Sequence, residues 1–284
     1  MDDLAIRTDA LTGQPTVIAG RRQARPNLPD QSCPFCPGGL EAPDDYEVRS
    51  FVNRWPPLPD GRAEVVLYAP EHDLSLGSLA PARLQRIVEL WAERTAELGQ
   101  RGDVDYVLVF ENRGPEVGAT IRHPHGQIYA FSEVPPAAAV ELDRPDCVLC
   151  DTQPGERLVA EQGGWRAWVP EAATWPYGLV LAPSAHTPDL PAEVVSPAGG
   201  LPDLISEVFG RLDRLFDAPM PYMWWWHQRP TDGRTWPGAH LHAHVAPLLR
   251  APGTPRFVAA GELGSGVFFN PVPPEVAAAH LRDA

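Results

Sequence analysis

The feature that most constrains this chain is a spacing of cysteines and histidines that occurs twice. All four cysteines fall into two Cys-x-x-Cys pairs. In each half a histidine stands 36 residues after the second cysteine, from 36 to 72 and from 150 to 186. A His-x-His pair follows at 123–125 in the first half and at 242–244 in the second. The matched landmarks are Cys33, Cys36, His72 and His123 in one half and Cys147, Cys150, His186 and His242 in the other.

Paired thiols in a chain that begins without an export signal favour metal binding over structural disulfides. Two thiolates and two imidazoles suit zinc, and four protein ligands leave no open position on the ion. The spacing therefore predicts two structural zinc sites, one in each half. The alternative for each set is a pair of free core thiols with surface histidines, and the matched spacing of the two halves favours zinc.

Between the landmarks each half has one helical pattern and one apolar strand. Apolar residues at helical spacing predict helices over 81–98 and 202–216, and apolar runs predict strands over 106–110 and 222–226. We expect 137–140 and 191–200 to be connectors, the first of which joins the halves. These patterns predict a duplicated α+β unit, with one copy in residues 1–135 and the other in 136–284.

The His-x-His pair of the first half also indicates chemistry. Alternate residues of a strand point to one face, so His123, His125 and Gln127 should form one row. A metal at His123 would fix the backbone and hold the His125 imidazole ready to attack phosphorus, which gives a nucleotidyl-histidine intermediate. Gln127 can donate a hydrogen bond to a phosphoryl oxygen but cannot act as a general acid, which suits a good leaving group such as a sugar phosphate.

The second half should lack this activity. Its row would continue from His242 through His244 to Ala246, so neither glutamine nor histidine stands in the third place. We therefore expect the second copy to be catalytically degenerate.

The charge of the chain limits its partners. A formal net charge of −14 argues against non-specific binding to nucleic acid. The chain has no apolar run long enough to cross a membrane and starts without a signal peptide, so we expect a cytoplasmic protein without a membrane partner. An anionic substrate would need a local positive pocket.

Several further motifs appear in a fixed order along the chain. They are the CPFC of 33–36, the FVNRWP of 51–56, the FENRG of 110–114, the HPHGQ of 123–127 and the LHAH of 241–244 followed by PLLR at 247–250. Together they resemble the galactose-1-phosphate uridylyltransferase family, a branch of the histidine-triad superfamily. The resemblance implies duplicated histidine-triad-like halves, mostly antiparallel sheet with helices packed on it, the first half catalytic.

The resemblance also implies an activity and a set of substrate contacts. Family members move UMP between UDP-hexose and hexose 1-phosphate by a ping-pong mechanism, here through His125 as nucleophile and Gln127 as its partner. They are homodimers in which C-terminal residues of one subunit approach the sugar bound to the other. The positions that match substrate contacts are Arg22, Arg25, Phe51, Asn53, Trp55, Asn112, Gly118, Thr120, Arg256 and Glu262. On an acidic chain this resemblance implies one local positive pocket, formed by Arg22, Arg25, Arg113 and Arg256.

Three alternatives remain open at this point. The segment 261–272 resembles a branch with nucleotide-sugar phosphorylases, in which inorganic phosphate is the acceptor and ADP a possible nucleotide. A zinc-stapled module without turnover would bind nucleotide and form no covalent adduct. Some family members hold a second metal with a glutamate and three histidines, although the second cysteine pair favours the Cys2His2 set in this chain. The positions that match this alternative set are Glu141, His227, His242 and His244.

Overall fold

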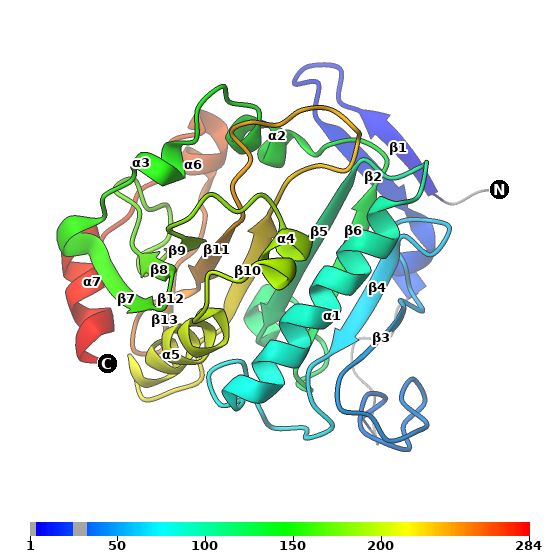
Figure 1. The fold of residues 1–284 in the computed structure, drawn as a ribbon, viewed down its shortest axis with the longest axis horizontal. Coiled ribbons are helices and arrows are strands. Elements are labelled where there is room, and N and C mark those ends of the chain that lie inside the picture. The colour runs from blue at the N-terminus through cyan, green and yellow to red at the C-terminus, as the bar shows by residue number, and fades with distance from the viewer. Residues whose placement is uncertain (1–3, 25–32) are drawn as a thin grey trace.

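The structure of the chain, a computed structural model, describes residues 4–24 and 33–284. Within these residues the centre of the fold is a nine-stranded sheet whose neighbouring strands are all antiparallel. The strand order is β3-β4-β6-β5-β10-β11-β9-β8-β7 (Figure 1). The strands are β3 (Arg49–Val52), β4 (Ala63–Leu67), β5 (Tyr106–Arg113), β6 (His125–Phe131), β7 (Leu158–Gln162), β8 (Trp165–Trp168), β9 (Leu179–Pro183), β10 (Tyr222–His227) and β11 (His242–Pro247).

The strand order itself shows the duplication. Outward from the centre, β5-β6-β4-β3 of the first half is matched by β10-β11-β9-β8 of the second, and β7 extends the second half by one strand. The two halves join where β5 pairs with β10, with Phe110 opposite Trp225. The predicted α+β class with duplicated halves and mostly antiparallel sheet is therefore confirmed, whereas the boundary between residues 135 and 136 stays a prediction.

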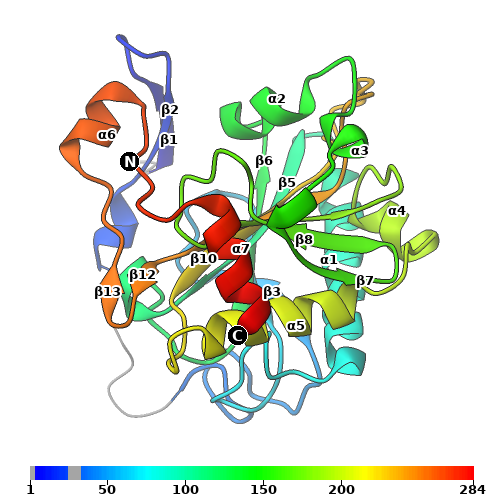
Figure 2. The same ribbon diagram turned by 90° about the vertical axis from the view of Figure 1, so that its left-hand side faces the viewer.

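Helices cover one face of this sheet. Figure 1 shows α1 (Pro81–Gly99), α4 (Leu190–Val195) and α5 (Leu201–Arg214) in front of the strands, and Figure 2 shows α7 (Pro274–Asp283) beside α5. The helices at 81–98 and 202–216 and the strands at 106–110 and 222–226 are confirmed within a few residues. The core between helices and sheet contains a cluster of indoles, in which the Trp91 ring centroid lies 5.3 Å from Trp224 and 6.3 Å from Trp226. Because alternate strand residues fill this core, the residues between them face the other side of the sheet, where the candidate site lies.

Both expected connectors contain helices. The first holds α2 (Pro136–Leu142), where a proline at the first position precedes a run of alanines that favours helix. The second holds α4, whose N-cap Asp189 accepts a hydrogen bond of 2.8 Å from the Ala192 N–H. The correction matters for function, because α2 carries Glu141.

The remaining elements are short. They are the strands β1 (Leu4–Thr8), β2 (Pro15–Ala19), β12 (Leu249–Ala251) and β13 (Thr254–Pro255), the helices α3 (Val148–Asp151) and α6 (Ala260–Ser265), and the 3-10 turns η1 (Gly20–Ala24), η2 (Pro115–Val117) and η3 (Gly155–Arg157). Among the described residues, none of the helices has the length and apolar character needed to cross a membrane.

Candidate functional site

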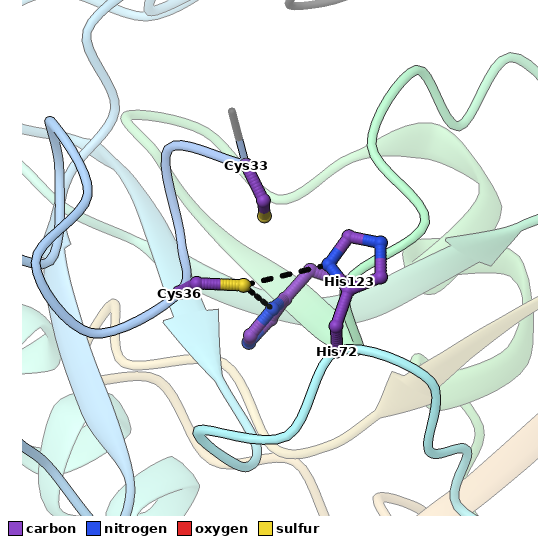
Figure 3. A group of neighbouring side chains, drawn as sticks. All are labelled: Cys33, Cys36, His72 and His123. Atoms are coloured by element: carbon purple, nitrogen blue, oxygen red, sulfur yellow. Dashed lines mark hydrogen bonds between the residues drawn. The ribbon is translucent and has the colours of Figure 1, made fainter. Parts of the chain in front are cut away.

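The first cysteine–histidine group is assembled as the sequence predicts. Figure 3 shows Cys33, Cys36, His72 and His123 pointing toward one another, and their ligand atoms all lie within 4.8 Å of each other. The Cys36 Sγ is 3.5 Å from the His72 Nδ1 and 3.6 Å from the His123 Nδ1. Zinc with bonds of about 2.3 Å to sulfur and about 2.1 Å to nitrogen at tetrahedral angles would separate these atoms by about 3.6 Å. The donor set and its spacing therefore fit zinc.

Neighbouring residues orient the ligand atoms of this group and affect their protonation. The His123 Nε2 lies 2.7 Å from the Ala69 carbonyl oxygen and 2.8 Å from the Tyr46 hydroxyl, which orients the ring and leaves Nδ1 for the ion. Burial lowers the pKa of His123 and thus favours the neutral, ligating form. Burial and the neighbouring Cys33 raise the pKa of Cys36 to about 11, so metal binding would displace a proton from that thiol.

The candidate nucleophile follows directly from this group. The His125 Nδ1 lies 2.7 Å from the carbonyl oxygen of His123, the expected metal ligand. A hydrogen bond between these two atoms fixes the orientation of the His125 ring. The Phe35 ring packs edge-on against the His125 ring, with centroids 5.0 Å apart. Phe35 stands between the two cysteines of the first pair, and no pattern in the sequence predicts this contact.

Gln127 is held in the same row. It lies opposite Val65 on β4 and Phe110 on β5, two residues beyond His125. Its Oε1 accepts a hydrogen bond of 3.3 Å from the Tyr129 hydroxyl, and this bond does not use the amide donors. Gly126, between the two, faces the core, where any Cβ would collide with the Tyr68 hydroxyl. A glycine is needed there for this close approach.

Part of the expected substrate set lies around this row. A cavity of about 30 Å³ is lined by His125, Asn112 and the loop residues Ala119 and Ile121, which flank Thr120. Gly118, which precedes Ala119, has a φ of 82°, a conformation that favours glycine. The loop of the two expected phosphate contacts thus lies beside the expected nucleophile.

The expected base-and-ribose contacts lie on the outer strand and the loop after it. Phe51 is opposite Val65, and its ring centroid is 5.9 Å from that of Phe35. The Asn53 Oδ1 accepts a hydrogen bond of 2.8 Å from the Trp55 N–H. Arg22 donates to the Trp55 carbonyl oxygen across 3.3 Å. Arg25 lies outside the described residues.

A buried carboxylic acid stands beneath this site. Glu111, next to Asn112 on β5, accepts hydrogen bonds from the Tyr222 hydroxyl (3.1 Å) and the Trp224 Nε1 (2.9 Å). Burial raises its pKa to about 7, and the bonds from Trp224 and Tyr222 oppose that change. In the sequence Glu111 is part of the FENRG motif, and that motif alone does not predict a buried carboxyl group.

The described arginines do not form the expected positive pocket. Arg113 pairs with Asp213 at 2.5 Å, and the buried Arg256 pairs with Glu262 at 2.5 Å. Both guanidinium charges are therefore offset by neighbouring carboxylates. Glu262 also accepts hydrogen bonds from the backbone N–H groups of Ala259 and Phe269, so within one chain this pair stabilises the C-terminal segment.

The second cysteine group differs from the expected set in one ligand. The structure gathers Cys147, Cys150, His186 and His240, not His242. The His240 Nδ1 is 3.1 Å from the Cys147 Sγ and 3.5 Å from the Cys150 Sγ. His240 is buried, and burial together with the nearby His186 lowers its pKa to about 4. Its neutral imidazole and the two thiols fit zinc.

His242 belongs to a third group, the alternative that the sequence disfavoured. Glu141 comes from α2, and His227, His242 and His244 come from β10 and β11. The Glu141 Oε2 lies 2.7 Å from the His227 Nδ1 and 2.9 Å from the Nε2 atoms of the other two rings. Burial alone would raise the pKa of Glu141, yet these contacts hold it well below its usual range. One carboxylate and three imidazoles that converge on one point fit a divalent transition metal.

The strand pairing explains the error. His244 is opposite Val180 and Trp225, as Gln127 is opposite Val65 and Phe110, so His244 occupies the place of Gln127. The place of His125 belongs to His242, whose Nδ1 lies 2.7 Å from the His240 carbonyl oxygen, the geometry found at His125. The row of the second half is therefore His240, His242 and His244, and its third place does hold a histidine.

Comparisons with known proteins place this chain among its relatives. Residues 52–135 match the family model described as galactose-1-phosphate uridyl transferase, N-terminal domain, and residues 143–282 match the model of its C-terminal domain. The galactose-1-phosphate uridylyltransferase of Thermotoga maritima is 32% identical over 99% of this chain and 98% of its own length. The ADP-glucose phosphorylase of Arabidopsis thaliana is 26% identical over 98% and 89% of the two lengths.

The fold agrees as well. A solved structure of a uridylyltransferase superposes with a TM-score of 0.88 at 28% identity, over 98% of this chain and 97% of that one. With both domain models matching in order, on a sheet that aligns His125 and Gln127 beside a cysteine–histidine group, this chain belongs to the galactose-1-phosphate uridylyltransferase family.

Proposed function

We propose that this protein moves UMP between UDP-glucose and galactose 1-phosphate. The observation that carries the proposal is the fixed row of His125 and Gln127, in which the Nδ1 of His125 is engaged by the carbonyl of the expected metal ligand His123. That bond assigns the attack to the other ring nitrogen. The names of the relatives, uridylyltransferases over nearly the full length, supply the substrate class.

The reaction takes place in two displacements at one phosphorus. The His125 Nε2 attacks the α-phosphorus of UDP-glucose, the bond from that phosphorus to the bridging oxygen breaks, and glucose 1-phosphate leaves with the electron pair. A phosphate oxygen of galactose 1-phosphate then attacks the same phosphorus, and the electron pair of the P–N bond returns to His125. Gln127 donates to a phosphoryl oxygen during both steps. Asn112, Gly118 and Thr120 border the phosphates.

Different residues around the site contact different parts of the substrate. Phe51, Asn53 and Trp55 hold the base and ribose, and Arg22 and Arg25 supply positive charge. Phe35, which touches both His125 and Phe51, limits the motion of the nucleophilic ring.

The metals have structural roles in this proposal. Two zinc ions would be held by the cysteine groups, the second with His240 in place of His242, and a further divalent metal by the group of Glu141. The first zinc would anchor the backbone that precedes His125. The second half does not transfer nucleotide, because the Nε2 of His242, which corresponds to the attacking atom of the first half, points into the group of Glu141 and would be a metal ligand there.

We also propose a homodimer, in which the segment around Arg256 and Glu262 lies against the sugar end of the partner's site. The exposed side chains of Phe257 and Phe269 in that segment are apolar surface that a second subunit would cover.

The test is a labelled covalent intermediate. UDP-glucose with label in the α-phosphate should leave acid-labile label on the wild-type protein. His125→Ala should abolish it, whereas His280→Ala, a histidine bonded to Tyr177 in the other half, should retain it. A chase with galactose 1-phosphate should remove the label as labelled UDP-galactose. Label that survives His125→Ala would overturn the mechanism.

The same chase separates the neighbouring activities. Release by inorganic phosphate, and loading from ADP-glucose in preference to UDP-glucose, would identify a phosphorylase like the named plant relative. Absence of label with every nucleotide sugar would identify a binding module.

A further inference from the structure

The second half has counterparts of the apolar residues around His125 as well as of the histidines. In the first half an apolar cluster lies beside His125 on the face opposite the helices, and an apolar cluster occupies the same place beside His242. Strand pairing equates them, because Phe51 is opposite Val65 as Trp168 is opposite Val180. Between the cysteines, Phe35 corresponds to Leu149. The matched residues are Phe35, Phe51 and Val65 in one half and Leu149, Trp168 and Val180 in the other.

In the second half this position is an open cavity. Its volume is about 270 Å³, and its apolar wall includes Val148, Leu149 and Val180. Small-molecule pockets begin at about 300 Å³, so a cavity of this size suits a ligand no larger than a nucleoside monophosphate and excludes a whole nucleotide sugar. Its other wall is the third metal-binding group, with Glu141, His242 and His244. The cavity therefore has an apolar end for a base and a polar end beside the cluster.

The polar end determines which ligand the cavity can accept. Without a cation, the Glu141 carboxylate would repel a phosphate. A divalent ion in the third group carries two positive charges against the single negative charge of that carboxylate, so the wall becomes attractive to an anion. Arg144 also lines this cavity.

We propose that the second half binds a nucleoside monophosphate in this cavity, with the base against Leu149 and Val180 and the phosphate toward the loaded metal group. The ligand is bound and not transferred, since the Nε2 of His242 points into the third metal-binding group and would be a ligand of its metal. The assignment of a nucleotide rests on the proposed function, because it equates this cavity with the pocket of the first half.

The test is the number of nucleotides bound per chain. Equilibrium dialysis of labelled UMP, and in a second arm labelled AMP, should give two per chain for the metal-loaded protein. Val180→Phe should fill the cavity and leave one, and its counterpart Val65→Phe should close the first pocket and also leave one. A chelator that removes the metal of the third group should reduce the count of Val65→Phe to none.

A surface variant covers the case in which the larger side chains disturb folding. Arg144 lines the cavity and is exposed, so Arg144→Glu should fold and repel the phosphate, while Arg144→Gln should not. Metal content should be equal in both variants. One UMP per wild-type chain, with none in Val65→Phe, would overturn the second pocket while the labelled His125 still reported the proposed function. Two per chain without label on His125 would retain the pocket and overturn the transfer.

Discussion

The buried Glu111 should make the stability of this protein fall as pH rises. Its carboxyl is 4% exposed, and its pKa is raised from 4.5 to about 7. Below pH 4.5 the folded and unfolded chains both carry the proton. Between pH 4.5 and about 7 only the folded chain binds it, so each step up in pH favours unfolding; above pH 7 the effect is constant. A difference from 4.5 to about 7 corresponds to about 3 kcal/mol of unfolding free energy.

The substitution Glu111→Gln isolates this effect, because the amide has nearly the shape of the acid and does not titrate. We would measure urea unfolding of the metal-loaded wild type and variant from pH 5.5 to 8. The wild type should lose about 2 kcal/mol relative to the variant over that range, since part of the change occurs below pH 5.5. All other titrating groups cancel in the difference.

A matched control uses a carboxyl shifted the other way. Burial raises the pKa of Glu207, but hydrogen bonds from Gln162 and Arg211 outweigh it and lower the pKa below its usual value. Its contribution to stability is therefore complete above pH 4.5, so Glu207→Gln should differ from wild type by a constant amount between pH 5.5 and 8. A constant difference for Glu111→Gln as well, or one that grows in favour of wild type with pH, would refute the reasoning.

Three further predictions concern metals, the close approach at the site and the core. The metal-loaded protein should contain three metal ions per chain by atomic emission. Cys150→Ser and Glu141→Ala should each lower this count by one, and each should lose a different ion. Loss of the same ion in both variants would contradict separate sites. Gly126→Ala should cost about 1–3 kcal/mol of stability, because its Cβ meets the Tyr68 hydroxyl. The double variant with Tyr68→Phe should recover part of that loss in urea unfolding, and no recovery would show that the hydroxyl is not the obstacle. Trp91→Ala should lose about 3–5 kcal/mol in the same measurement, since its ring is fully buried among indoles.

The architecture could be predicted from the sequence because apolar periodicity and ligand spacing are patterns within short segments of the chain. Apolar periodicity located both long helices and both central strands, and the spacing of the cysteines predicted which four side chains gather in the first cysteine–histidine group. Alanine-rich 136–142 was misjudged, because a short helix of small residues has no strong apolar periodicity to set it apart from a loop.

In the second half, the spacing of the candidate metal ligands does not decide which histidine joins the cysteines. Three histidines at alternate positions, His240, His242 and His244, offer two overlapping His-x-His pairs that differ by two residues. Both registers keep the same face of the strand toward the metals, so alternation cannot choose between them. Only the tertiary position of Cys147, 3.1 Å from the His240 Nδ1, selects the register. An alignment of Gln127 with His244 would have assigned His240 to the position of His123, and so to the cysteine group.

The join of β5 to β10 ties the folding of the first half to the synthesis of the second. Tyr222 and Glu111, which share a hydrogen bond across this join, are 111 residues apart in the chain. Until β10 has been made, one edge of β5 offers unpaired backbone groups, and the Trp91 indole lacks its contact with Trp224. A nascent first half would therefore expose an edge that can pair with another chain, and the cell would have to protect it until the second half arrives.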